Sequence, residues 1–299
     1  MEAIFKRFFN TLIVAFISVF MVLLCHVVSY ADIVPTASGT KTIVGGGITI
    51  DYSNTKDGYL MAKCSEKYPR VKIQIIKEKE TYTYDLDCND KYVVFPLQMG
   101  DGEYTVRAMK NVGETKYAMI TSGKVSVKLE NALSPYLIPN QIVNYTKDSE
   151  TVKKSNELTV KKDTDLKKIE SIYEYIIKNI TYDDEKAKEV VSKVYFPVVD
   201  NILKTKKGIC YDYSAVLATM LRSQGIPTKL VTGYVSPTGT YHAWNEIYIT
   251  GVGWVDSEIY FDGVNWQRVD STFASTDKNS KAINKYIQDN ANYQKKYQY

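Results

Sequence analysis

Cys210, His242 and Asp270 are residue types that could together form a covalent catalytic site. Cys210 follows Gly208-Ile209 at the expected start of a helix with an apolar stripe. His242 opens a segment whose small and bulky side chains alternate as in a strand, and Asp270 ends another expected strand. A thiol, an imidazole that takes its proton and a carboxylate that orients the imidazole are the parts of a nucleophilic triad.

The thiol of such a site needs a positive neighbour. A cysteine ordinarily has a pKa of about 8.5, so only a few per cent of it is thiolate at neutral pH. The N–H groups at a helix N-terminus stabilise an anion by about 0.3–1 kcal/mol, which corresponds to less than one pK unit. An imidazolium must supply the larger share of the thiolate's stabilisation. The sequence has two histidines, and because His26 lies in the apolar N-terminal segment, His242 is the candidate base.

The first residues predict export from the cell. An apolar run over residues 8–28 follows Lys6-Arg7, and Ser29-Tyr30-Ala31 offers the small residues that a signal peptidase requires. We therefore expect residues 1–31 to be removed and the rest to be secreted or at the cell surface. The alternative is an uncleaved anchor, since an apolar run of about 18 residues reaches the lower limit for a membrane span. In that case residues 8–28 are the membrane contact.

The cysteines predict one disulfide and one free thiol. Of the four cysteines, Cys25 lies in the export segment, which leaves Cys64, Cys88 and Cys210. An odd number in an oxidising compartment leaves one thiol without an intramolecular partner. Cys64 and Cys88 share the N-terminal region and are the expected pair, and the alternative is that both are separate buried thiols.

The composition excludes two other classes of protein. The chain has no Cys-x-x-Cys or His-x-x-x-His pair, so we expect no metal and no cofactor. The net charge is +4 at pH 7, and short basic pairs such as Lys161-Lys162 and Lys206-Lys207 are typical of solvated faces. No basic run is long enough for a nucleic-acid groove, so we expect no nucleic-acid partner.

Short segments with strand periodicity occupy the first part of the chain, over 32–130. Alternation is clearest in Val71–Ile76, and turn residues such as Asp57-Gly58 and Asp101-Gly102 separate the segments. Strands at this spacing without a helical period predict an antiparallel β-sandwich similar to an immunoglobulin-like fold. Prolines and a polar stretch then predict a linker over 131–160.

A second domain with mixed helices and strands is expected over 161–277. Apolar residues recur every three or four positions from Leu166 to Ile180, which predicts a helix capped by Asp163 or Asp165. The helix that begins at Cys210 should stop before Gly225, and strands should follow it, giving an α+β fold. The polar residues over 278–299 predict a C-terminal helix without an evident function.

Four motifs make this second domain resemble the transglutaminase-like superfamily. In order they are Lys207-Gly208-Ile209-Cys210-Tyr211-Asp212-Tyr213, Leu221-Arg222-Ser223-Gln224-Gly225-Ile226-Pro227, His242-Ala243-Trp244-Asn245-Glu246 and Val269-Asp270-Ser271-Thr272-Phe273. The resemblance implies a papain-like fold, a catalytic Cys, His and Asp in that order, and acyl transfer through a thioester. Asp256, in Gly253-Trp254-Val255-Asp256, is a second candidate for the carboxylate. Asp270 is favoured because the Asp-Ser-Thr-Phe sequence that it begins resembles the family's motif.

The resemblance implies an enzyme that acts on amide bonds of a protein or peptide, for example one at the cell wall or cell surface. Transamidation, deamidation and hydrolysis share the thioester and differ in whether an amine or water resolves it, so the triad does not distinguish them. The alternative is a surface-binding protein on the same scaffold without activity, because a fold does not fix a function.

Overall fold

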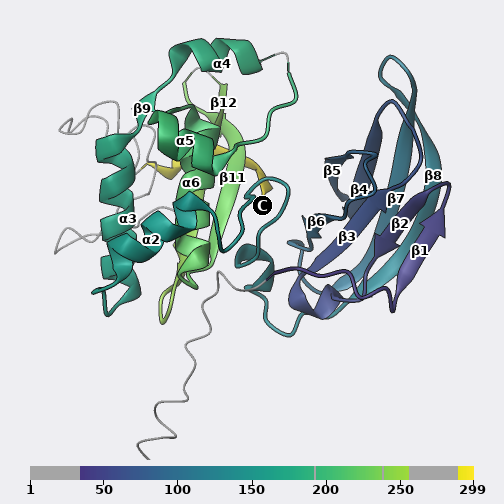
Figure 1. Ribbon diagram of the computed structural model, residues 1–299, viewed down its shortest axis with the longest axis horizontal. Coiled ribbons are helices and arrows are strands. Elements are labelled where there is room, and N and C mark those ends of the chain that lie inside the picture. The colour runs from purple at the N-terminus through teal and green to yellow at the C-terminus, as the bar shows by residue number, and fades with distance from the viewer. Residues whose placement is uncertain (1–33, 192, 238, 256–288) are drawn as a thin grey trace, which may run out of the picture.

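The computed structural model describes residues 34–191, 193–237, 239–255 and 289–299 of the 299-residue chain. The chain up to Val127 is built from strands, and the part from Glu150 onward combines helices with further strands (Figure 1). The predicted α+β class is therefore confirmed. Among the described residues, no helix is both long and apolar enough to cross a bilayer. The segment for which we predicted export, 1–31, lies outside the described residues.

Two four-stranded sheets contain the strands of the first part, and within each sheet the neighbouring strands are antiparallel. The first sheet has the order β1-β2-β3-β6, with β1 (Thr42–Gly45), β2 (Ile48–Asp51), β3 (Tyr59–Cys64) and β6 (Val93–Pro96). The second has the order β5-β4-β7-β8, with β4 (Val71–Lys77), β5 (Glu80–Leu86), β7 (Gly102–Gly113) and β8 (Lys116–Val127). The predicted antiparallel strands are thus present in this region.

The two sheets share a buried apolar core. Ile50 and Leu60 of the first sheet and Ile73 and Val106 of the second are all fully buried members of one cluster. The strand β3 did not stand out in the sequence, because five of its six residues are buried and alternation of apolar with polar residues is lost. It lies inside its sheet, with β2 on one edge and β6 on the other.

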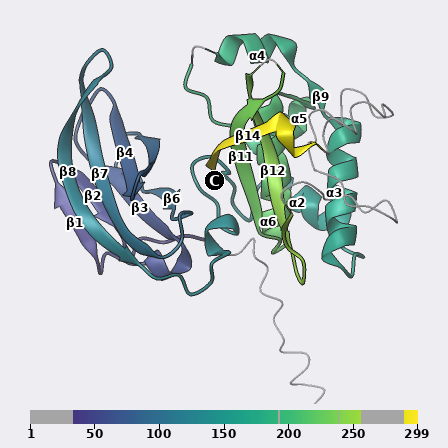
Figure 2. The same ribbon diagram turned by 180° about the vertical axis from the view of Figure 1, so that it is seen from behind.

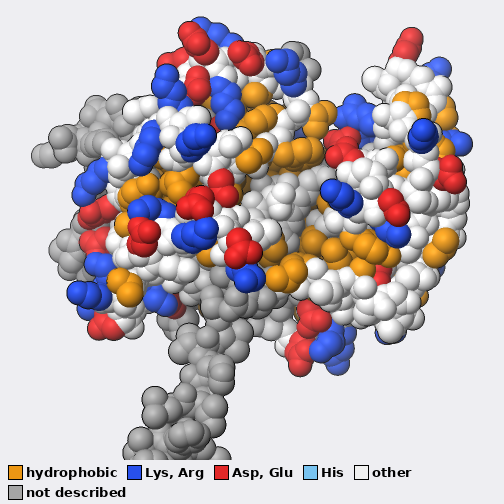
Figure 3. All heavy atoms as spheres, in the orientation of Figure 1, with side chains coloured by type: hydrophobic (Ala, Val, Ile, Leu, Met, Phe, Trp, Pro, Cys, Tyr) orange, Lys and Arg blue, Asp and Glu red, His pale blue; other side chains and the backbone are white. Residues whose placement is uncertain are grey.

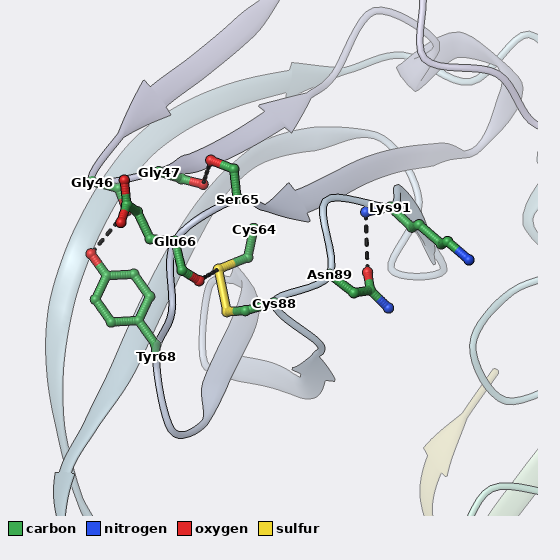
Figure 4. Close-up of a disulfide and its surroundings, with 9 residues drawn as sticks. All are labelled: Gly46, Gly47, Cys64, Ser65, Glu66, Tyr68, Cys88, Asn89 and Lys91. Atoms are coloured by element: carbon green, nitrogen blue, oxygen red, sulfur yellow. Dashed lines mark hydrogen bonds between the residues drawn. A yellow bond between two sulfur atoms is a disulfide. The ribbon is translucent and has the colours of Figure 1, made fainter.

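A disulfide joins Cys64, at the end of β3, to Cys88, which confirms the predicted pair (Figure 4). The bridge closes a loop with a sequence separation of 24 residues that contains the β4–β5 hairpin. It therefore connects the end of a strand in one sheet to the exit of a hairpin in the other. Cys64 is fully buried, and Cys88 is partly buried.

We expect Cys88→Ala to lower the free energy of unfolding by roughly 3 kcal/mol, the loop entropy that a bridge of this length removes from the unfolded chain. Urea unfolding of residues 32–299, followed by far-ultraviolet circular dichroism, measures this. Reduction of the wild type should produce a similar loss, which makes it the matched control. A midpoint that changes in neither experiment would show that the bridge contributes nothing to stability.

The helices of the second part are α2 (Glu150–Thr159), α3 (Asp165–Asn179), α4 (Asp184–Val190), α5 (Val199–Thr205) and α6 (Cys210–Ser223). The predicted long helix is α3, but its cap is Thr164, whose hydroxyl accepts a hydrogen bond from the N–H of Lys167, and not Asp163 or Asp165. Helix α6 begins at Cys210, as predicted.

Helix α2 lies within the predicted linker over 131–160, which is therefore not a linker at its C-terminal end. The helix packs against α3, α5 and α6. Its buried face is mostly polar: the Ser155 hydroxyl donates to the Met220 carbonyl at 2.8 Å, and Thr159 contacts the Gln224 side chain at 2.8 Å. Because hydrogen bonds rather than apolar side chains hold this face, its composition looked like that of a linker.

A four-stranded sheet of order β13-β12-β11-β14 lies beside α6. Its strands are β11 (Thr228–Val235), β12 (Thr240–Ile249), β13 (Gly253–Val255) and β14 (Tyr293–Gln298), and a separate two-stranded parallel pair joins β9 (Thr181–Tyr182) to β10 (Lys207–Gly208). The predicted C-terminal helix over 278–299 is wrong for 293–298, which add to the sheet as β14 (Figure 2). Tyr297 of β14 and Tyr299, which directly follows the strand, both pack on Tyr82 of β5, so period two is the correct pattern there.

Candidate active site

Cys210 is the first residue of α6 and is partly exposed. It is the free cysteine of the part of the chain that the structure describes. The preceding residue, Ile209, has extended backbone dihedrals, so the helix begins at the residue that carries the thiol. The first N–H groups of α6 have no acceptor within the helix, and they favour a negative charge at this position.

The connection before Cys210 is shaped by Gly208 and Asp212. The Asp212 carboxylate accepts a hydrogen bond from the Ile209 N–H at 2.9 Å and so caps the first turn of α6. A Cβ at residue 208 would lie 2.7 Å from the Cβ of Asp212. Only glycine therefore leaves room for this cap, which explains the residue two positions before the thiol.

The strand pair β9–β10 positions Tyr182 next to the same connection. Tyr182 pairs with Gly208, and the Tyr213 hydroxyl of α6 donates to the Ile180 carbonyl at 2.8 Å. Burial, and then the charge of Cys210, raise the pKa of Tyr182 to about 12. The phenol therefore keeps its proton near neutral pH and lies within electrostatic range of the thiol.

His242 lies on β12, opposite Gly233 of β11. The side chain is buried, with 6% exposed, and its ring stacks on Trp244 with centroids 6.3 Å apart. A Cβ at residue 233 would lie 2.1 Å from the backbone oxygen of Gln294 in β14. Glycine at this position lets β14 approach β11 directly beside the histidine.

Asn245 connects the strand of His242 to the helix of Cys210. Its side-chain N–H₂ donates to the Ser214 carbonyl of α6 at 3.0 Å and to the Lys229 carbonyl of β11 at 3.1 Å. Ser214 is one helical turn beyond Cys210, and Asn245 is three residues beyond His242. Asn245 belongs to the motif that begins at His242, but no local pattern indicates its role. Its two hydrogen-bond partners, Ser214 and Lys229, are distant from it in sequence.

The structure thus brings together the elements that carry Cys210 and His242, since α6 packs against both β11 and β12. The third predicted residue, Asp270, lies outside the described residues, and so does the alternative Asp256. The choice between these two carboxylates stays a prediction.

One family model matches the part of the chain that contains this site. Residues 152–271 match the family model of the transglutaminase-like superfamily. The match begins in α2, two residues into the helix that the sequence had placed in a linker. It ends one residue beyond Asp270 and therefore contains all three predicted site residues.

Several named proteins are similar to part of this chain. The uncharacterized protein YebA of Bacillus subtilis is 31% identical over 33% of this chain and 16% of its own length. The kyphoscoliosis peptidase of Mus musculus is 31% identical over 29% of this chain and 14% of its own. A protein-glutamine gamma-glutamyltransferase of Pseudomonas aeruginosa is 34% identical over 19% of this chain and 10% of its own length. The chain therefore spans less than a fifth of the length of these relatives.

Among solved structures, red sea bream transglutaminase aligns with a TM-score of 0.31 and 14% identity. The alignment covers 78% of this chain and 54% of that protein.

Proposed function

Because residues 152–271 form a domain of the transglutaminase-like superfamily, we propose that this chain is an exported thiol enzyme that acts on amide bonds of a protein or peptide. The observation that carries the proposal is the position of Cys210, an unbridged, partly exposed cysteine at the N-terminus of a helix that packs against the strand of the candidate base. A thiol that served only to fill the core would be buried away from a helix terminus.

In the proposed reaction the Cys210 thiolate attacks the carbonyl carbon of a substrate amide, and His242 as imidazolium gives its proton to the departing nitrogen. The product of this half-reaction is a thioester on Cys210 and a free amine or ammonia. Neutral His242 then takes a proton from water or from a primary amine, which attacks the thioester and releases the thiolate. Asp270 would accept a hydrogen bond from the second ring nitrogen and keep the imidazole in the required tautomer.

The negative oxygen of the tetrahedral intermediate needs hydrogen-bond donors in the same place. The N–H of Cys210 at the start of α6 is the main-chain candidate, since it has no acceptor within the helix. The neighbouring phenol of Tyr182 retains its proton at neutral pH. Tyr182 of β9 pairs with Gly208 of β10, which lies two residues before Cys210.

Export is proposed on separate grounds. Residues 1–31 have the charge, apolar run and small residues of a signal peptide. The Cys64–Cys88 bridge supports the same view, because disulfides persist in oxidising compartments outside the cytoplasm. A secreted or cell-surface enzyme would meet proteins and peptides of the cell wall or surface as substrates.

We also propose that the N-terminal domain is immunoglobulin-like. If β2 and β3 are taken as strands A and B, then β4, β5, β6, β7 and β8 follow as C, C′, E, F and G. The sheets β2-β3-β6 and β5-β4-β7-β8 then correspond to A-B-E and C′-C-F-G, which supports this assignment. The domain would add to the enzyme a separate surface for a partner or for the substrate.

The experiment is to incubate residues 32–299 with a glutamine-containing protein, with and without a fluorescent primary amine, and to follow the reaction by mass spectrometry. We expect an acyl adduct on the Cys210 peptide in the wild type and none in Cys210→Ala. Incorporation of the amine identifies transamidation, ammonia release without it identifies deamidation, and new N-termini identify hydrolysis. Equal activity in Cys210→Ala would refute the mechanism, and no adduct with a broad panel of proteins would favour a binding protein.

A further inference from the structure

Asp212 is a fully buried carboxylate in the first turn of the helix that begins at Cys210. Three groups donate to it: the Ile209 N–H at 2.9 Å, the Lys186 ammonium at 2.6 Å and the Tyr195 hydroxyl. A buried carboxylate is costly unless it is paired and hydrogen-bonded, and this one is both. Ile209 directly precedes the helix, whereas Lys186 and Tyr195 come from a separate part of the chain.

Lys186 and Tyr195 belong to the connection between β9 and α5. Lys186 lies on α4, and no residue of this helix is buried in the core. The Lys186 side chain is 25% exposed. Its ammonium also lies 4.6 Å from the centre of the Tyr195 ring, so the cation contacts both the carboxylate and the phenol. The Asp183 N–H donates to the Gly208 carbonyl at 3.0 Å, which brings the start of α4 to the residue pair preceding Cys210.

An unpaired carboxylate at this place would oppose the thiolate. The N–H groups at the start of α6 favour a negative sulfur, but a second negative charge in the same turn disfavours it. A cation bonded to that carboxylate cancels most of the repulsion. Among the described residues, Lys186 is the cation in ion-pair contact with Asp212.

The other titratable groups around the carboxylate do not replace Lys186. Tyr182 of β9 and Tyr211 of α6 lie within electrostatic range, and burial raises the pKa of both phenols, so they are neutral near pH 7. Asp184, at the start of α4, acts on Tyr182 and is a further negative charge. On the sheet side, His242 of β12 is the proposed partner of the thiol itself.

We infer that Lys186 is a positioning residue which, through Asp212 and Tyr195, holds α4 against the nucleophile helix and keeps the thiol of Cys210 ready to ionise. The inference rests on the proposed function only for its importance to catalysis. The contact itself is a set of hydrogen bonds that does not depend on which substrate is used.

The test is the rate of Cys210 alkylation by iodoacetamide against pH, in residues 32–299, where the bridge leaves Cys210 as the free thiol. Lys186→Met keeps the length of the side chain and removes its charge, so the midpoint of the profile should rise by about one to two pH units. Asp212→Asn removes the opposing charge and should move the midpoint down. Lys186→Arg should restore the wild-type profile.

Lys188→Met is the matched control, because Lys188 is an exposed lysine on the same helix, and its profile should equal the wild type. A folded Lys186→Met protein with the wild-type midpoint would overturn the inference. Loss of the near-ultraviolet circular dichroism in that variant would overturn it too, since Lys186 would then support the whole fold and not the thiol. Alkylation needs no substrate, so a shifted profile without turnover would contradict the proposed function and leave this inference standing.

Discussion

Replacing His242 by alanine is expected to lower turnover by at least about 10³-fold, because the variant loses both the group that keeps Cys210 ionised and the acid that protonates the leaving nitrogen. The alkylation profile of Cys210 should move toward the ordinary thiol pKa of about 8.5. Imidazole added to the buffer is expected to recover little activity, since the site of His242 is buried. Steady-state kinetics on a protein that the wild type converts measure the effect on turnover, and the alkylation profile measures the effect on the thiol.

Tyr248→Phe is the control for this variant. Tyr248 lies six residues along the same strand and contacts Trp254, with ring centroids 5.5 Å apart, so its hydroxyl can be removed without touching the thiol. Its turnover and alkylation profile should match the wild type. If His242→Ala retained wild-type turnover, His242 would not be the base, and the triad would have to be abandoned.

Replacing Arg222 by alanine is expected to lower the free energy of unfolding by about 3–5 kcal/mol. Arg222 is fully buried at the C-terminal end of α6 and donates to three carbonyl oxygens. These belong to Ile138 at 2.8 Å, Thr228 at 2.9 Å and Tyr299 at 2.7 Å. The alanine variant removes this donor from three acceptors, two of them in buried hydrogen bonds, and opens a cavity as well.

Burying the charged Arg222 side chain has a free-energy cost, and the lowered pKa of its guanidinium reflects this cost. Burial lowers the pKa of the guanidinium to about 10, so the residue is still charged at neutral pH. Its burial is offset because the guanidinium bonds to three segments at once: the connection before α2, the start of β11 and the residue that follows β14. An arginine suits this task better than a lysine, since its planar fork directs several donors to separate acceptors.

Two variants make this prediction specific. Arg222→Lys keeps the charge but offers a single ammonium, and we expect a loss intermediate between wild type and Arg222→Ala. Arg107→Ala removes an exposed arginine from β7 and should change stability by less than about 0.5 kcal/mol. Chemical denaturation, analysed with the same dependence on denaturant concentration for each variant, measures the free energies of unfolding of all three variants. A loss below about 1 kcal/mol in Arg222→Ala would mean that water replaces the three donors.

Several elements of the fold could be predicted because their signal is local. Helix α3 shows an apolar residue every three or four positions, and β4 alternates from Val71 to Ile75, so the period of each element can be read from its own residues. The Cys64–Cys88 pair followed from counting cysteines. By contrast, β3 and α2 were missed because burial on two faces hides alternation in the first, and hydrogen-bonded polar residues hide the buried face of the second.

The sequence by itself determined which residues could do chemistry: a single free cysteine at a helix start, a single histidine outside the N-terminal segment, and the motifs around them. Only the tertiary structure decided what surrounds them. The bonds of Asn245 to α6, of Lys186 to Asp212 and of Arg222 to the Ile138 and Tyr299 carbonyls join residues 26 to 84 positions apart. Such contacts depend on how elements pack, and no local period or composition encodes which distant carbonyl or carboxylate a side chain will meet.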